Sequence, residues 1–341
     1  MNTGGKRQVW SVASYILALT LAAVACSNKT TPTGTQSPGA TKQALKVGMA
    51  LPGPKNDNGF NQFHYEGLLA AEKKFGAQIS FKENVVDPQA RVDVLRDLAQ
   101  DNKLAIGVGA EFAEAGVVVA PEFSDVTFMI INGETSDVPN LHVYGIREGV
   151  PAYIAGVVAG HLTKSHKVGF VGGEEIPPLT QAKDGFTAGA QSVDPSNKVL
   201  ATVVGSFVDA QKSYAAASSQ IADGADFIYG YVDAGIAGVV EAIKDSKKPV
   251  GAFAIFAPRC DNWPDQMTGT SFVDSSAFVV AMVNDFVNKS VPKEPRLIGV
   301  EDPNVERFEL CPKFNTPELQ KVVKDTTDGI NSGQIQLPQG V

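Results

Sequence analysis

Short apolar runs alternate with amphipathic segments from Leu45 onward. The first helix-like segment, at 63–76, places Leu68, Ala71 and Phe75 on one face, as a helix period requires. Such alternation is typical of a parallel sheet covered by helices on both faces. The β-branched runs of this first set lie at 45–51, 77–83, 103–109, 126–132 and 141–146.

The pattern restarts near residue 149 with a second set of helix-like and strand-like segments. We therefore predict an α/β fold, with two Rossmann-like lobes built on parallel sheets. The tail has too few elements for a third domain, so we expect several crossovers between the lobes. The predicted N-terminal lobe comprises 45–146 and 274–292, and the predicted C-terminal lobe comprises 147–273 and 293–332.

The first 25 residues have the pattern of an export signal, with Lys6 and Arg7 before an apolar run. The run ends in Ala-Val-Ala before Cys26, which is similar to the lipobox of a bacterial lipoprotein. We expect Cys26 to be lipidated and to anchor the exported protein at the outer face of a membrane or in a periplasm. An ordinary signal peptidase site and an uncleaved membrane span are the alternatives.

Residues 26–44 form a predicted tether rich in Thr, Ser, Pro and Gly. Without residues 1–25 the chain has 27 Lys and Arg against 37 Asp and Glu, a net charge of −10. That surface disfavours nucleic acid polymers as partners.

Two further cysteines, Cys260 and Cys311, form an even pair in a chain predicted to be exported. We expect a disulfide between them, although two unrelated small core residues would read the same way.

The sequence contains no G-x-S-x-G, H-E-x-x-H, Walker A or C-x-x-C motif, so we expect no enzyme activity and no cofactor. Its histidines share no ligand spacing, and we expect no metal site. They are His64, His142, His161 and His166.

Loops at the carboxyl ends of parallel strands are where such folds hold ligands. Among them, "NDNGFNQ" at 56–62 carries an aromatic residue, Phe60, beside amides and a carboxylate. A packing role for Phe60 against the following helix is the alternative to ligand contact. Our candidate ligand contacts in these loops are Asp57, Phe60, Asn61, Glu111, Phe112, Asn132, Phe207, Tyr231, Asp233 and Asp274.

The loop 57–61 resembles the D-x-S-F-N motif of the basic membrane protein family, which are substrate-binding lipoproteins of ABC importers. Further segments similar to this family are "YIAGVVAG" at 153–160, "KVGFVGGEEIP" at 167–177, the long run at 185–212 and "IADGADFIYG" at 221–230. The resemblance covers residues 45–331. It implies the type I periplasmic-binding-protein fold, a purine nucleoside or related ligand, and an ABC permease as partner, with the receptor itself a monomer.

The resemblance also implies that Phe60 and Phe207 cover opposite faces of a purine ring, while Asp57 and Asn61 hydrogen-bond to its edge. An aromatic pair contributes roughly 0.5–1.5 kcal/mol beyond area burial.

Several positions depart from the family pattern. Asn132 stands where many relatives have a carboxylate, and the two regions that hold the ribose in nucleoside-binding relatives read Phe253–Phe256 and Ser271–Asp274 here. The family's A-G-G-T-G segment has become 232–236, which introduces Asp233. We therefore expect an acidic pocket that favours a nucleobase or amine-bearing heterocycle, unless Asp233 and Asp274 only cap helices.

The sequence thus predicts a solute receptor of an ABC importer. A sensory receptor of the same fold, binding another amine-bearing solute, is one alternative. An exported nucleoside-processing enzyme is the other.

Overall fold

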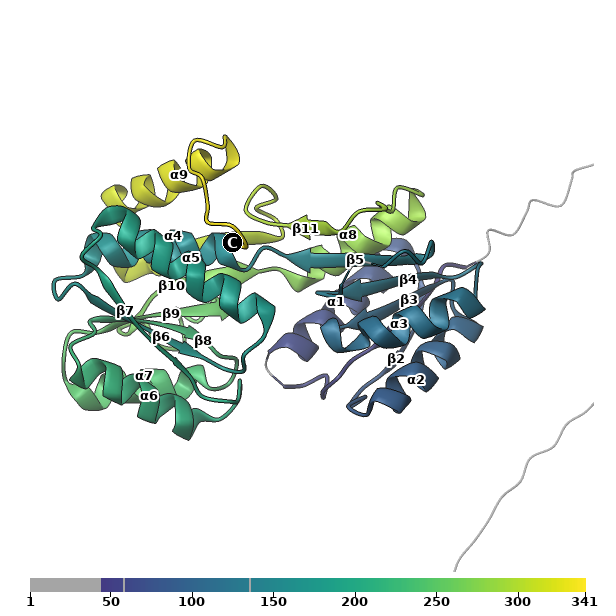
Figure 1. Ribbon diagram of the computed structural model, residues 1–341, viewed down its shortest axis with the longest axis horizontal. Coiled ribbons are helices and arrows are strands. Elements are labelled where there is room, and N and C mark those ends of the chain that lie inside the picture. Colours follow the sequence, from purple (N-terminus) through teal and green to yellow (C-terminus); the bar gives the residue numbers. More distant parts are fainter. Residues whose placement is uncertain (1–43, 58, 135) are drawn as a thin grey trace, which may run out of the picture. The chain divides into compact units, whose positions relative to one another are not determined.

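A computed structural model describes residues 44–57, 59–134 and 136–341 (Figure 1). Within residues 44–341 the strands form two separate six-stranded sheets, which confirms the predicted pair of α/β lobes. The predicted signal peptide, Cys26 and nearly all of the predicted tether lie outside the described residues. No helix in the described part of the chain has both the length and the apolar character to cross a membrane.

The first sheet has the strand order β11-β5-β4-β3-β1-β2, and its neighbours pair in parallel. Strands β3 and β4 are almost wholly buried because helices cover both faces, so they read as continuous apolar runs. The strands of this sheet are β1 (Lys46–Ala50), β2 (Gln78–Lys82), β3 (Leu104–Val108), β4 (Thr127–Ile131), β5 (Leu141–Ile146) and β11 (Arg296–Ile298).

Four helices cover the first sheet in two packed pairs, α1 with α8 and α2 with α3. Asp87 begins α2, and its carboxylate accepts hydrogen bonds from the first-turn amides of Gln89 and Ala90. The helices are α1 (Phe60–Phe75), α2 (Pro88–Asp101), α3 (Ala113–Val119) and α8 (Ser275–Val287), with short 3₁₀ turns η1 (Ala110–Phe112) and η2 (Ala120–Glu122).

The second sheet has the order β12-β10-β9-β8-β6-β7. Its strands are parallel except β12, which runs antiparallel to β10. Helices α4, α5 and α9 pack together, and α6 packs on α7 across the sheet from them (Figure 1). The strands are β6 (Lys167–Gly172), β7 (Lys198–Val203), β8 (Phe227–Tyr231), β9 (Gly251–Phe256), β10 (Met267–Val273) and β12 (Glu306–Leu310). The helices are α4 (Gly149–Leu162), α5 (Pro177–Val193), α6 (Ala210–Ala222), α7 (Ile236–Ser246) and α9 (Pro317–Asn331), with a 3₁₀ turn η3 (Pro312–Phe314).

The chain leaves the first sheet after β5, returns to that lobe after β10, and leaves again after β11. The predicted boundary at residue 292 therefore needs correction, because β11 pairs with β5 in the first sheet. Arg296 of β11 forms an ion pair with buried Asp285 of α8, and Asp285 also accepts a hydrogen bond from the Tyr144 hydroxyl at 2.9 Å. This polar network ties β11 to the first lobe.

Backbone hydrogen bonds join the crossover segments to one another. The Arg147 amide donates to the Ile298 carbonyl at 2.8 Å, and the Asp274 amide donates to the Val305 carbonyl at 2.7 Å. The segments that connect the lobes are thus bonded side by side.

Cys260 and Cys311 form a disulfide, as the sequence predicts. The bridge connects the loop after β9 to the end of β12, with a sequence separation of 51.

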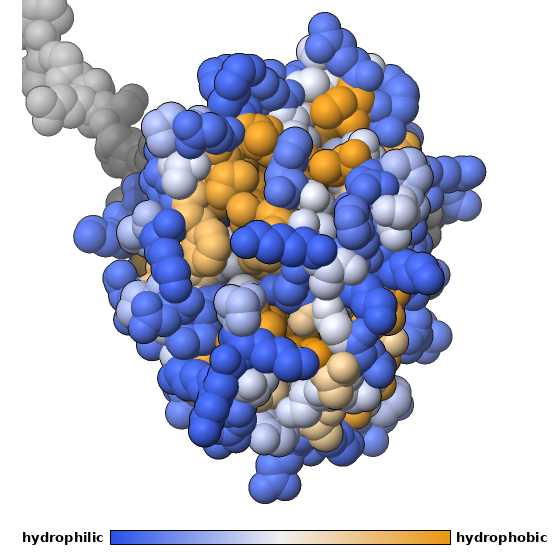
Figure 2. Space-filling view, turned by 90° about the vertical axis from the view of Figure 1, so that its left-hand side faces the viewer, coloured by the Kyte–Doolittle hydropathy of each residue, from blue (hydrophilic) through white to orange (hydrophobic). Residues whose placement is uncertain are grey.

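The outer face of the second lobe is mostly hydrophilic, with groups of hydrophobic residues between the hydrophilic ones (Figure 2). Over the whole sequence, acidic residues outnumber basic ones and give a net charge of −8.

Candidate functional site

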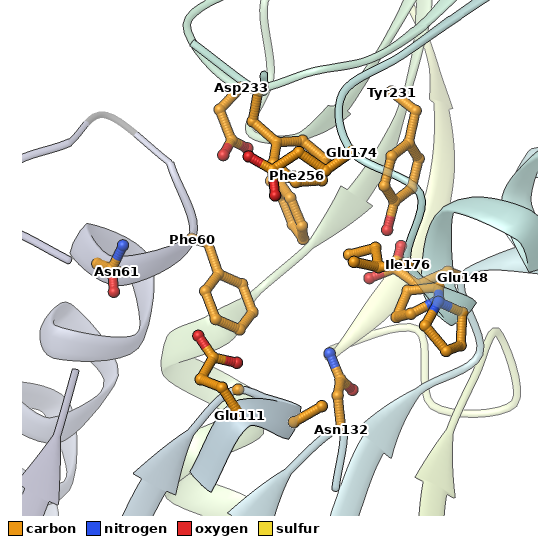
Figure 3. Close-up of a pocket in the computed structure, with 15 residues that line it drawn as sticks. Phe60, Asn61, Glu111, Asn132, Glu148, Glu174, Ile176, Tyr231, Asp233 and Phe256 are labelled. Atoms are coloured by element: carbon orange, nitrogen blue, oxygen red, sulfur yellow. The ribbon is translucent and has the colours of Figure 1, made fainter. Parts of the chain in front are cut away.

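A cavity of about 340 Å³ lies between the two lobes, and residues of both lobes line it (Figure 3). Its volume falls within the roughly 300–1,000 Å³ that is usual for small-molecule sites. The lining follows the carboxyl ends of several strands, which is where open α/β sheets hold ligands. The lining residues are Phe60, Asn61, Gly109, Ala110, Glu111, Asn132, Glu148, Glu174, Ile176, Pro177, Pro178, Phe207, Tyr231, Asp233 and Phe256.

Aromatic rings reach the cavity from both lobes. Phe60 stands in the first turn of α1, and its ring centroid lies 6.4 Å from that of Phe256 at the end of β9. Phe207, in the loop after β7, lies 6.4 Å from Tyr231 at the end of β8. A flat ligand in this cavity would meet ring surfaces from each side.

His64 supports Phe60 from behind. The Nδ1–H of His64 donates to the Phe60 carbonyl at 2.7 Å, and the two ring centroids are 4.4 Å apart. Burial lowers the pKa of His64 to about 4, so the ring is neutral at ordinary pH. The Phe60 ring therefore packs on a buried imidazole that is itself fixed by a hydrogen bond.

Asp57 organises the loop that carries Phe60. Its carboxylate accepts hydrogen bonds from the backbone amides of Gly59, Asn61 and Gln62 at 3.0–3.2 Å. Asn61 bridges this carboxylate to Gly53, since its side-chain amide donates to Asp57 at 2.6 Å and its carbonyl accepts from the Gly53 amide at 3.0 Å. Asp57 is not part of the cavity lining, and the Asn61 side chain is already engaged in holding the loop.

Four carboxyl side chains line the cavity: Glu111, Glu148, Glu174 and Asp233. No Lys, Arg or His is among the described residues of the lining. The predicted acidic character of the pocket is therefore matched by the lining, although Glu148 and Glu174 were not among the predicted contacts.

Asp233 and Glu148 are the most confined of these carboxyl groups. The Oδ1 of Asp233 is buried and has no hydrogen-bond partner among the described residues. Burial raises the pKa of Asp233 to about 7, with repulsion from Asp57 adding to it and Arg259 opposing it. Glu148 is 4% exposed, and burial followed by repulsion from Asp233 raises its pKa to about 8.

Gly59 of the first lobe lies against Asp233 of the second lobe. A Cβ atom at Gly59 would lie 2.7 Å from the Asp233 Cγ, which is closer than a Cβ atom can approach. Any larger residue at position 59 would thus displace this carboxyl group. Asp233, which the sequence marks as a departure from the family pattern, is thus in contact with the loop that carries Phe60.

The remaining predicted contacts divide into two groups. Glu111, Asn132, Phe207 and Tyr231 line the cavity. Phe112 and Asp274 do not.

Phe112 is fully buried in the core of the first lobe, because η1 turns neighbouring side chains in different directions. The Asp274 carboxylate accepts a hydrogen bond from the Ala277 amide at 2.8 Å and begins α8. The helix-capping alternative thus describes Asp274, whereas no described residue donates to Asp233 Oδ1.

Phe256 and Glu148 are lining residues that the sequence did not reveal. Phe256 has a φ of 63°, a left-handed conformation that is rare for a bulky residue and often marks a functional position. Glu148 precedes the first residue of α4, a position where acidic residues are common, so the sequence does not mark it as a ligand contact. Glu174 follows the end of β6, in the kind of strand-end loop where the sequence predicts ligand contacts.

No cluster of three or more His, Cys, Asp or Glu side chains suited to a metal ion occurs within 44–57, 59–134 and 136–341.

Residues 44–306 match the family model described as Bmp, ABC transporter substrate-binding protein PnrA-like. The chain belongs to this family. The purine-binding protein of Brucella abortus is 30% identical over 300 residues, which cover 86% of this chain and 83% of that protein. The nucleoside-binding protein BmpA of an ABC transporter of Lactococcus lactis is 29% identical over 250 residues, covering 71% of this chain and 70% of that protein. The resemblance to the basic membrane protein family is thereby confirmed.

Solved structures confirm the fold. A solute-binding protein of an ABC transporter system from Aeropyrum pernix aligns with a TM-score of 0.74 at 19% identity, covering 86% of this chain and 94% of that one. A solute-binding protein from Conexibacter woesei aligns with a TM-score of 0.67 at 24% identity, covering 87% and 99%. The chain has the type I periplasmic-binding-protein fold, and as a Bmp family member it is a substrate-binding protein of an ABC transporter.

Proposed function

We propose that this protein captures a purine nucleobase, nucleoside or related flat heterocycle in the cavity between its lobes and presents it to an ABC permease. The observation that carries the proposal is the set of aromatic rings from both lobes around one cavity that carboxyl and amide groups also line. The rings suit a planar ligand, and the carboxyl groups suit its N–H donors.

The names of two relatives support a ligand of this class. One is called purine-binding and the other nucleoside-binding, at 30% and 29% identity to this chain. Substitution at the ribose-binding regions separates this chain from the nucleoside-binding pattern. Phe256, which ends the first of these regions, places an aromatic ring in the cavity lining instead of a carboxylate.

The receptor acts by closing around its ligand. Phe60 belongs to the first lobe and Phe207 to the second, so a ligand that contacts both rings favours the closed arrangement. A membrane permease would recognise that arrangement. A lipid on Cys26 and the tether that follows would keep the receptor near it.

Calorimetry with matched pairs tests the ligand class. Purified protein is titrated with adenine, adenosine, hypoxanthine and inosine, and with cytosine as a smaller ring. We expect at least one purine to bind, and each base to bind at least as tightly as its nucleoside because the ribose-binding residues are absent.

Absence of binding by every purine would overturn the proposal. A strong preference for the nucleoside of each pair would instead retain the purine class and overturn the argument from the ribose-binding regions. Mass spectrometry of small molecules released from the protein as first purified gives an independent identification.

A further inference from the structure

A row of carboxyl groups runs from the first lobe through the cavity to the crossover segments. Asp57 lies near enough to Asp233 to raise its pKa, Asp233 does the same to Glu148, and Glu148 to buried Glu306. Two arginines oppose this row: Arg259 beside Asp233, and Arg147 beside Glu306. Neither arginine lines the cavity.

Two members of the row, Asp233 and Glu148, line the cavity. Among the described residues, the buried Oδ1 of Asp233 has no hydrogen-bond partner, and Glu148, which is 4% exposed, lines the same cavity. Figure 3 shows both carboxyl groups on the second-lobe side of the cavity, with the Phe60 ring facing them. A donor for Asp233 Oδ1 must therefore come from the ligand or from water.

Neutral N–H donors on a ligand would form these hydrogen bonds but would not offset the negative charge of the carboxyl groups. Burial holds the pKa of Asp233 at about 7 and that of Glu148 at about 8, so sealing both groups from water as carboxylates is costly unless positive charge beyond that of Arg259 lies beside them. A cationic ligand supplies that charge and makes charge-assisted hydrogen bonds, which are about twice as strong as neutral ones.

The aromatic lining favours the same kind of ligand. The faces of Phe and Tyr rings attract cations, by roughly 0.5–2 kcal/mol each according to how dry the site is. Phe60, Phe207, Tyr231 and Phe256 all line the cavity that holds Asp233 and Glu148.

The Asp233 carboxyl group lies in space that is open only because residue 59 is a glycine. The absence of a side chain at Gly59 leaves the space that the Asp233 Cγ approaches, and the two residues come from different lobes. A carboxyl group whose only role was to begin α7 would not need room on the opposite lobe.

We propose that the ligand of this cavity is a cationic heterocycle, with Asp233 and Glu148 holding its charged N–H groups and the aromatic rings covering its faces. The inference rests on the proposed function, since it names the charge of the flat ligand that the receptor captures.

Two pairs of methylated isomers separate charge from shape. 1-Methyladenine and 1-methyladenosine take up a proton near neutral pH, whereas N6-methyladenine and N6-methyladenosine have the same atoms and stay neutral. Calorimetry near neutral pH should show that the wild-type protein binds the N1-methyl isomer of at least one pair about tenfold more tightly or better, as a charge-assisted contact requires.

Isosteric neutral variants locate the preference. The double variant Glu148→Gln with Asp233→Asn should lose it, while Glu175→Gln, an exposed neighbour of the cavity that does not line it, should keep it. Thermal unfolding of each apo variant shows whether it is folded, and the single variants Glu148→Gln and Asp233→Asn serve if the double variant is not.

Equal or tighter binding of the neutral isomers would overturn the inference and leave the proposed function intact. Preference for the cation that survives in the double variant would also overturn it, because other residues would then select the charge. If no purine of either charge binds, the proposed function and this inference both fail.

Discussion

Two loops, one from each lobe, carry an aspartate near the cavity, and the two carboxyl groups differ in their hydrogen bonding. In the loop 57–61 of the first lobe, Asp57 accepts four hydrogen bonds from its own loop. In the loop after β8 of the second lobe, Asp233 has a buried oxygen with no hydrogen-bond partner in the part of the chain that the structure describes. The two carboxyl groups are near enough for Asp57 to raise the pKa of Asp233. They differ in how many hydrogen-bond donors surround each of them.

This difference distinguishes a carboxylate that holds the loop backbone in place from one that is available to bind a ligand. When donors of the chain occupy its lone pairs, a carboxylate fixes a backbone and has little left to offer. When an acceptor is buried and unoccupied, the folded protein bears a desolvation cost that a ligand can remove. Asp57 belongs to the first kind and Asp233 to the second.

The largest effect on ligand binding is expected from truncating the ring that the Asp57 loop presents. Phe60→Ala, and Phe207→Ala on the opposite lobe, should each weaken binding by roughly 2–4 kcal/mol, as for other buried aromatic contacts. Both rings line the cavity, so the apo variants should stay folded.

The measurement pairs ligand titration with thermal unfolding of each apo variant. Wild-type affinity in either variant would remove that ring from the site. An affinity loss that merely follows unfolding of the apo protein would do the same.

Removing the shaping carboxylate should lower stability. Asp57→Ala leaves the first-turn amides of α1 without their acceptor, and we expect a loss of about 1–2 kcal/mol in the free energy of unfolding, the usual range for such caps. Chemical denaturation of the apo protein measures it. A variant as stable as wild type would show that water replaces the carboxylate at no cost.

Neutralising Asp233, the carboxyl group that lines the cavity, should raise stability, by a smaller amount that depends on pH. The pKa of Asp233 is raised to about 7 in the folded protein from an ordinary 3.8, so the folded state binds more protons than the unfolded state between these values. The stability that this group contributes is present below pH 4 and is lost as the pH rises through 7. At pH 8, Asp233→Asn should therefore be more stable than wild type.

We expect a gain of about 1 kcal/mol, because the side chain is partly exposed and solvent screens its charge. At pH 4 the two proteins should be equally stable. Denaturation at both pH values checks this, and a variant less stable than wild type at pH 8 would mean that Asp233 has a stabilising partner.

Much of the fold was predictable because buried parallel strands leave continuous apolar runs in the sequence. Strand β11 was assigned to the wrong lobe because a three-residue strand carries no periodicity of its own. Its place is decided by the contact of Arg296 with Asp285, which only the folded chain reveals.

The site was predictable where position in a loop implies position in space. Phe60 and Phe207 follow strand ends and do line the cavity. Glu148 follows β5 in a helix start, where acidic residues are common for local reasons. Phe256 is the last residue of a buried strand, and the residues adjacent to it in sequence do not predict its left-handed backbone conformation. Phe112 lies next to a lining residue, but its ring enters the core.

The backbone bonds between crossover segments have a mechanical consequence. Because Arg147 is bonded to Ile298, and Asp274 to Val305, a segment cannot twist alone without stretching a peptide hydrogen bond in its neighbour. The connection between the lobes therefore behaves as a small ribbon rather than as independent tethers. Its stiffness comes from backbone peptide groups, so the segments bend together whatever side chains stand at positions 147 and 305.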